Sequence, residues 1–179
     1  MILLAIDSSS TPAQLALQNS GEFFFKSLSG RHRQNETLMP NIDSLFKEHN
    51  ISANKLKAVA CIRGPGSFTG LRIGLSIAKA LALALDIPLY TENGLMLQAL
   101  EAENRGLPVL SLIPAREKSY YALLIKNGQE QIERKIYSSQ EIISIGKNYA
   151  ELLLVGEGGS TFYDEAKDDI SLKLLKYNP

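Results

Sequence analysis

The sequence is poor in the residues that build metal sites and covalent cross-links: it has one cysteine and two histidines among 179 residues. A single cysteine, Cys61, excludes an internal disulfide and a multi-cysteine zinc site. Its place in the apolar run KAVACI indicates a buried thiol. His32 and His49 form no HxxxH or HExxH pair, so both are expected at the solvated surface and no metal site is expected. No G-x-S-x-G elbow is present, so we assign no catalytic residue and expect no cofactor.

An excess of charge of one sign is also missing, because 19 Lys and Arg residues balance 19 Asp and Glu residues. No net positive field would therefore hold the chain on nucleic acid or on an anionic membrane. The start MILLAID lacks the basic region and cleavage site of a signal peptide. The apolar stretch over residues 73–85 is broken by Ser76 and Lys79 and is expected to be too short to cross a bilayer. These features predict a cytoplasmic protein without membrane contact.

Apolar periodicity predicts the same series of elements twice along the chain. The first series has strands over residues 2–6, 13–17 and 22–28, a helix over about 35–49, a strand over 56–62 and a helix over about 71–85 that ends at Asp86 and Pro88. The second has strands over residues 109–113, 120–125 and 131–136, a helix over 140–147 and a strand over 152–155. At a constant offset, Leu3 aligns with Leu110, Ile6 with Ile113, Leu17 with Leu124 and Gly21 with Gly128. We interpret this as an internal duplication with a shortened second copy.

Two β-β-β-α-β-α halves are the architecture of the actin-like ATPase superfold, which is ribonuclease H-like and includes sugar kinases, actin and chaperone ATPases. The predicted class is therefore α/β, with a first domain over residues 1–103 and a reduced second domain over residues 104–179. A likeness at the level of the fold does not by itself give a function.

A glycine-rich segment, RGPGSFTGLRIG, follows the fourth predicted strand. We expect its residues Gly64, Pro65, Gly66, Ser67, Phe68 and Thr69 to form a structural loop. The pattern is one residue longer than the dinucleotide fingerprint and lacks the Lys-Ser or Lys-Thr of a P-loop. Two interpretations stay open: a tight turn that leads into a close helix start, or a loop whose free N–H groups hold an anion.

The first predicted hairpin carries an acid, Asp7, at the place where nucleotide sites of the superfold have one, but it has no glycine. Pro114 stands at the corresponding place of the second copy, so that half offers no carboxylate for a metal. Asp7 is therefore predicted to be a vestigial nucleotide site. The alternative is a small nucleotide-dependent phosphotransferase or ATPase that uses Asp7 and the Gly64–Gly70 loop, which requires binding of magnesium and ATP.

The helix predicted after this loop is apolar over more than half of its circumference. At about 100° per residue, Arg72, Ser76 and Lys79 share one narrow polar face with Asp86. One sheet cannot bury so wide an apolar arc, so a second surface is required, either another helix of the chain or a partner subunit. The predicted partner interface is the flank Gly70, Leu71, Gly74, Leu75, Ala78 and Ala82, with the opposite flank, Ile73, Ile77, Ala80 and Ala84, as the alternative.

ILLAIDSSS at the start and RGPGSFTGLRIG followed by IAKALAL resemble the TsaB (YeaZ) family, which acts in the threonylcarbamoyladenosine modification of tRNA. The resemblance is strong over about residues 1–90 and weaker through IPAREKSYYALL. Two departures stand out. Gln34 and Asn35 replace a histidine followed by a small polar residue, and the chain lacks the longer C-terminal tail of many members.

The resemblance implies an actin-like, TsaD-like (Gcp-like) fold with no catalytic site of its own. It also implies a non-catalytic scaffold that binds its paralogue TsaD, the transferase, and in some members a second copy of itself, through helices of the first domain. The ATPase TsaE joins such assemblies, and tRNA is reached only through the complex.

Overall fold

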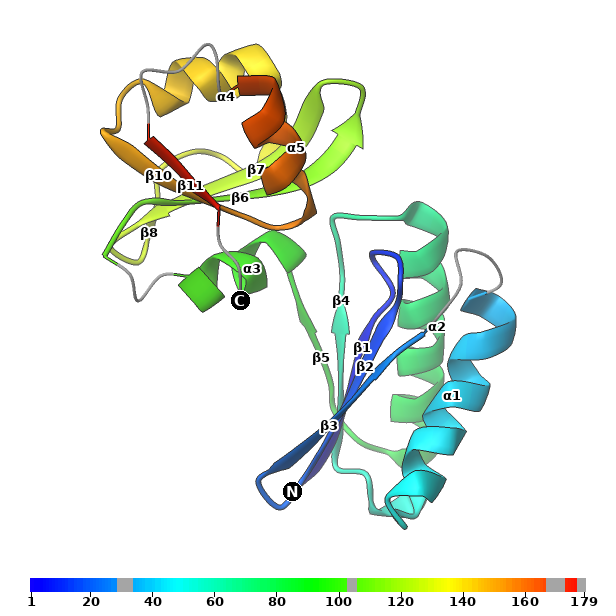
Figure 1. Cartoon of the computed structure of the whole chain (residues 1–179). Helices are drawn as coiled ribbons and strands as arrows, with labels where there is room; N and C mark the ends of the chain where they lie inside the picture. Colours follow the sequence, from blue (N-terminus) through cyan, green and yellow to red (C-terminus); the bar gives the residue numbers. More distant parts are fainter. Residues whose placement is uncertain (29–33, 103–105, 167–172, 177–179) are drawn as a thin grey trace. The chain divides into compact units, whose positions relative to one another are not determined.

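The structure is a computed structural model that describes residues 1–28, 34–102, 106–166 and 173–176. It divides into two compact units, Met1–Asn93 and Gly94–Pro179 (Figure 1). Helix α3 (Gly94–Ala102) belongs to the second unit, whereas the sequence placed it before a boundary at residue 103. The reason is packing, because the buried residues Leu95, Ala99 and Ala102 of α3 join the apolar cluster on one face of the second sheet.

The first unit is a five-stranded sheet of order β3-β2-β1-β4-β5. Its strands are β1 (Ile2–Asp7), β2 (Gln14–Asn19), β3 (Glu22–Ser27), β4 (Ala58–Ile62) and β5 (Leu89–Glu92), and a 3₁₀ turn (Ala53–Lys55) precedes β4. The strands β1, β2 and β3 form an antiparallel meander, to which β4 and β5 are added in parallel. Along β1 the side chains alternate, so that Leu4 and Ile6 are buried in the core.

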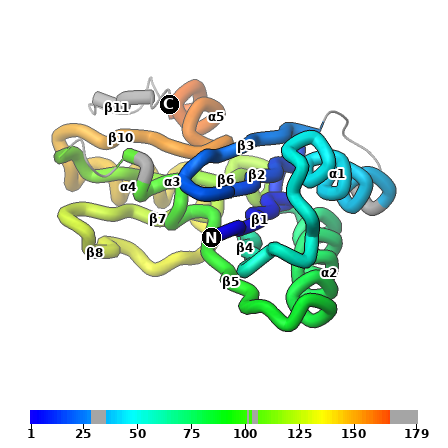
Figure 2. Tube along the Cα trace, turned by 90° about the horizontal axis from the view of Figure 1, so that it is seen from below, coloured from blue at the N-terminus to red at the C-terminus, as the bar shows by residue number. Residues whose placement is uncertain are grey.

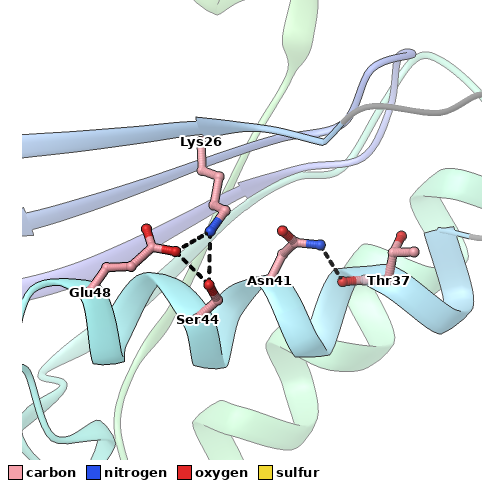
Figure 3. A network of polar contacts seen from close by, with 5 residues as sticks. All are labelled: Lys26, Thr37, Asn41, Ser44 and Glu48. Carbon is pink, nitrogen blue, oxygen red and sulfur yellow. Dashed lines mark hydrogen bonds and ion pairs between the residues drawn. The ribbon is translucent and has the colours of Figure 1, made fainter.

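Two helices, α1 (Gln34–Glu48) and α2 (Phe68–Leu85), share the apolar core that contains Leu4 and Ile6 of the first sheet. They run side by side in both views (Figures 1 and 2). Helix α1 buries Leu38, Ile42, Leu45 and Phe46, which recur at helical spacing. The helix continues through Pro40, and the side-chain amide of Asn41 donates a hydrogen bond of 2.9 Å to the carbonyl of Thr37 (Figure 3).

A polar network ties the edge strand β3 to α1 (Figure 3). The ammonium group of Lys26 donates to Ser44 Oγ at 2.9 Å and to Glu48 Oε1 at 2.6 Å, and Ser44 Oγ donates to the same carboxylate. These bonds, led by the one from Lys26, hold the pKa of Glu48 below its ordinary value. Nearby, the ring of His49 stacks on Phe24 with 3.7 Å between ring centroids, so His49 is half-buried and its predicted place at the solvated surface is wrong. His32 lies outside the described residues.

The second unit has a sheet of order β11-β10-β6-β7-β8, with β9 paired to β7. Its strands are β6 (Val109–Arg116), β7 (Ser119–Lys126), β8 (Gln129–Glu130), β9 (Lys135–Ser138), β10 (Glu151–Val155) and β11 (Lys173–Lys176). Helix α3 covers one face, and α4 (Ser139–Gly146) and α5 (Glu157–Ala166) pack on the other.

The pairing confirms the predicted duplication. Strands β6, β7, β10 and β11 repeat the antiparallel and parallel pairings of β1, β2, β4 and β5. Gly21 and Gly128 occupy equivalent turns, with φ of 94° and 73°. Helix α4 has 8 residues against 15 for α1, so the second copy is the shorter one. The single third strand predicted over residues 131–136 is wrong, because β8 ends before this segment at Glu130, residues 131–134 form no strand, and β9 begins only at Lys135.

Candidate functional site

The glycine-rich segment is a short loop that ends in a helix cap. Helix α2 begins at Phe68, so Phe68 and Thr69, which were predicted in the loop, form the first helical turn. Ser67 is the reason: its Oγ accepts a hydrogen bond of 3.2 Å from the amide of Gly70, and its carbonyl accepts one of 2.8 Å from the amide of Leu71. The helix ends where the sequence predicted, at Asp86, which adopts the left-handed conformation of a C-terminal cap.

The loop is fastened to the hairpin that follows β1. The amide of Ser67 donates a hydrogen bond of 2.7 Å to the carbonyl of Ser9. A Cβ on Gly66, which has a φ of 151°, would lie 2.5 Å from the same carbonyl, so only glycine permits this approach. The carboxylate of Asp7 accepts hydrogen bonds from the amide of Ser9 at 2.9 Å and from its Oγ at 2.6 Å. These contacts favour the tight-turn interpretation over the anion-binding one, since an amide of the loop and the acid of the hairpin both bond to the chain itself.

A second contact joins the hairpin to α2 itself. The Oγ of Ser8, a residue with 1% of its surface exposed, donates a hydrogen bond of 2.8 Å to the carbonyl of Gly70. One turn further along, a Cβ on Gly74 would lie 2.0 Å from that Oγ. The helix therefore lies directly on the end of β1. Sequence reasoning missed the roles of Ser8 and Ser9. The available signal was three serines directly after a buried strand, together with the glycines at positions 66, 70 and 74, four residues apart, in the next motif.

This packing corrects the predicted interface. The small residues Gly70, Gly74, Ala78 and Ala82 are the buried stripe of α2 and face the sheet of their own unit. They are therefore unavailable to a partner while the helix packs in this way. Leu71 and Leu75 are half-buried, and Leu75 packs against the core of the first unit.

The opposite side of α2, which we call the outer face, consists of Phe68, Arg72, Ser76, Lys79 and Leu83, all exposed. Phe68 is 74% exposed and Leu83 is 83% exposed. The guanidinium of Arg72 lies 5.5 Å from the centroid of the Phe68 ring, a cation–π contact. The predicted polar face is thus confirmed as exposed, but it is bordered by two large apolar side chains. Met39 of the neighbouring helix α1 is also exposed.

Helix α2 has 18 residues and is longer than the stretch considered in the sequence. Within the described part of the chain, it is the one helix whose length and composition would suffice for a membrane span. The core helix of a soluble protein meets the same criterion, so the indication is weak.

In the ranges that the structure describes, no three His, Cys, Asp or Glu side chains gather as metal ligands would. Cys61 is buried in β4, and burial, with the negative charge of Asp7 as a smaller cause, raises the pKa of its thiol to about 11. In the second copy, a Cβ on Gly156 after β10 would lie 2.3 Å from the side-chain oxygen of Gln98, so this loop too is closed by atoms of its own unit.

Comparison with known proteins places the chain in a family. Residues 27–160, more than half of the chain, match a family model described as TsaD, tRNA N6-adenosine threonylcarbamoyltransferase. A Haemophilus influenzae protein named tRNA threonylcarbamoyladenosine biosynthesis protein TsaB is 30% identical over 147 residues, which cover 80% of this chain and 62% of that protein. The chain belongs to the TsaB (YeaZ) family. It spans about three fifths of the length of this TsaB relative.

Solved structures support the fold of this TsaB-family chain. A Pseudomonas aeruginosa protein described as similar to peptidase YeaZ superposes with a TM-score of 0.76 at 21% identity, over 99% of this chain and 83% of that one. A Bacteroides thetaiotaomicron protein described as having an actin-like ATPase fold gives a TM-score of 0.54 at 13% identity, over 99% and 91% of the two chains. The predicted actin-like fold is confirmed.

Proposed function

We propose that this TsaB-family chain is a non-catalytic scaffold subunit in the formation of threonylcarbamoyladenosine on tRNA, and that it binds a TsaD-type transferase. The name of the Haemophilus influenzae relative supports the pathway. The family model described as the transferase matches residues 27–160, which supports a common fold for the chain and its proposed partner. TsaE and a second copy of this chain are further proposed partners. Because acidic and basic residues balance, we propose that tRNA is reached through the complex.

The observation that carries this proposal is the outer face of α2. The helix is long and apolar. It buries a stripe of four small residues against its own sheet, and residues beside that stripe such as Ile73 and Leu75 are half-buried against the same core. Phe68 and Leu83 remain in water at opposite ends of the outer face. Burying such a side chain contributes on the order of 1.5–3 kcal/mol, and a few such anchors dominate most protein interfaces. Arg72 between them adds a side chain that is enriched at interface centres.

The half-buried Leu75 is a poor probe of this interface. A glutamate there would bring a charge against the core that Leu75 helps to cover, so it would destabilise the first unit whether or not a partner binds. Leu83 is the sharper probe, since most of its surface is in water and its replacement disturbs little of the unit.

The test is the affinity of the purified chain for the TsaD-type subunit of the same organism, measured by titration calorimetry. We expect Leu83→Glu to weaken binding by about tenfold or more, because it places a charge in a desolvated contact. Its circular dichroism and melting temperature should stay those of the parent chain. The matched control is Ile136→Glu, an exposed aliphatic residue on β9 of the second unit, which should bind as the parent does. A Leu83→Glu variant with unchanged affinity would remove α2 from the interface.

The same preparation tests the enzyme alternative. A phosphotransferase that uses Asp7 and the Gly64–Gly70 loop must bind magnesium and ATP, and must lose that binding in Asp7→Ala. The bonds that Ser9 donates to Asp7 and the bond that Ser9 accepts from Ser67 count against it, since they would have to be exchanged for ligand contacts.

A further inference from the structure

The carboxylate of Asp7 stands at the end of β1 and accepts two hydrogen bonds, both from Ser9. We propose that Asp7 is a positioning residue for α2: through Ser9 and Ser67 it fixes the first turn of the helix and so determines how the outer face is presented. The effect of this positioning on partner binding rests on the proposed function, whereas the positioning of α2 by Asp7 does not.

We call the series of contacts from Asp7 through Ser9 to Ser67 the relay. Its first step fixes the conformation of the hairpin. Bonds from both the amide and the hydroxyl of Ser9 to Asp7 Oδ1 fix Ser9 in space. Hydrogen bonds to an ionised acceptor are stronger than neutral ones. With Ser9 fixed in this way, its carbonyl is aimed at the loop that precedes α2.

The second step passes from the hairpin to the helix. The carbonyl of Ser9 accepts the amide hydrogen of Ser67 at 2.7 Å, and Ser67 is the cap of α2. The missing Cβ of Gly66 lets the loop approach this carbonyl. Ser67 Oγ accepts the amide of Gly70, one of the N–H groups at the helix start that have no backbone partner within the helix, and the Ser67 carbonyl accepts the amide of Leu71, the first regular backbone bond of α2.

A parallel contact joins the same hairpin to the first turn of the helix. Ser8, between Asp7 and Ser9, donates to the carbonyl of Gly70 from a fully enclosed position. Asp7, Ser8 and Ser9 thus hold both the cap and the first turn of α2. The acid that would serve a metal in a nucleotide site of this superfold here holds a helix whose outer face carries exposed Phe68.

The experiment is hydrogen–deuterium exchange on the full chain, followed in peptides that cover residues 64–71. We expect Asp7→Ala to speed exchange there by about tenfold or more, since it removes the acceptor of two charge-assisted bonds. Asp7→Asn keeps one neutral acceptor and should give a smaller increase. Asp86→Asn makes the same chemical change at the other end of α2 and should leave residues 64–71 as they are. Addition of magnesium and ATP to the parent chain should change nothing in this segment.

Three results would overturn the proposal: unchanged exchange over residues 64–71 in Asp7→Ala, an increase spread evenly over both units, or new protection of this segment by magnesium and ATP. If Asp7→Ala does not fold, Asp7→Asn and Ser9→Ala decide the matter, because both weaken the contact between Asp7 and Ser9, the first on its acceptor side and the second on its donor side. Affinity for the TsaD-type subunit should fall in the same order as exchange rises. A parent chain that does not bind that subunit would refute the proposed function. The exchange rates over residues 64–71 would then still test the positioning of α2 by Asp7.

Discussion

Replacement of Gly74 by alanine tests how closely α2 lies on β1. Alanine is the better helix former, and helix propensity alone predicts a gain of about 1 kcal/mol. The structure predicts the opposite sign. The new Cβ would lie 2.0 Å from the Oγ of Ser8 and 3.2 Å from its Cβ, and Ile6 closes the third side at 3.6 Å.

The cost has two parts. Overpacking of a filled site costs about 1–3 kcal/mol. Displacement of the Ser8 hydroxyl also breaks its buried bond to the carbonyl of Gly70, worth about 0.5–1.5 kcal/mol. After subtraction of the propensity gain, we expect Gly74→Ala to lower the free energy of unfolding by about 2 kcal/mol, measured by urea unfolding followed by circular dichroism.

A double-mutant cycle identifies the cause. Ser8→Ala alone loses one buried hydrogen bond and should cost about 1 kcal/mol. In the double variant the hydroxyl that blocks the new methyl group is gone, so its loss of stability should be clearly smaller than the sum of the two single losses. A Gly74→Ala variant as stable as the parent, or additive losses in the double variant, would refute the close contact.

Three further predictions concern single groups. The pKa of the Cys61 thiol is raised from 9.0 to about 11, which lowers its thiolate fraction about a hundredfold. Ellman's reagent should therefore label Cys61 in the native chain at least about a hundredfold more slowly than in the chain unfolded by urea. Equal labelling rates would contradict the burial of Cys61. Burial, with a hydrogen bond to Glu165 as second cause, raises the pKa of Tyr120 from 10.0 to about 12, so the folded state keeps a proton that the unfolded chain releases. This contribution to stability is complete below pH 10 and is lost between about pH 10 and 12, and tyrosinate absorbance should show one late-ionising tyrosine in the folded chain. Ser138→Ala removes the capping box that Ser138 forms with Glu141 at the start of α4 and should cost about 1 kcal/mol in urea unfolding; an unchanged midpoint would show that the cap does not contribute.

Much of the fold follows from local patterns in the sequence. The buried strand from Ile2 and the helix end at Asp86 were predictable, because a short continuous apolar run and a polar residue followed closely by Pro88 are signals carried by neighbouring residues. The constant sequence offset between the two copies predicted the second sheet, since similar apolar patterns form strands that pair in the same way, as β1 with β4 and β6 with β10. Strands β5 and β11 and helices α3 and α5 were not predicted. Each of the two strands has four residues, and the helices have nine and ten, so their periodicity is weak.

The side of α2 that faces the sheet could not be derived from the sequence. Gly70, Gly74 and Ala78 allow close approach to any surface, whether a partner helix or the chain's own strand. What decides between them is Ser8, which is 62 residues away from Gly70 and bonds to its carbonyl. A long-range contact of this kind produces no periodic pattern in the sequence. The exposure of Phe68 and Leu83 can therefore be inferred only once the buried side of α2 is known.

Light scattering of the purified chain, alone and mixed with the TsaD-type transferase subunit of the same organism, would decide whether the chain is a scaffold. We expect a discrete heteromeric mass in the mixture, whether or not the free chain forms a dimer, and its loss in Leu83→Glu. A mixture that shows only the masses of the two separate proteins would contradict the scaffold function.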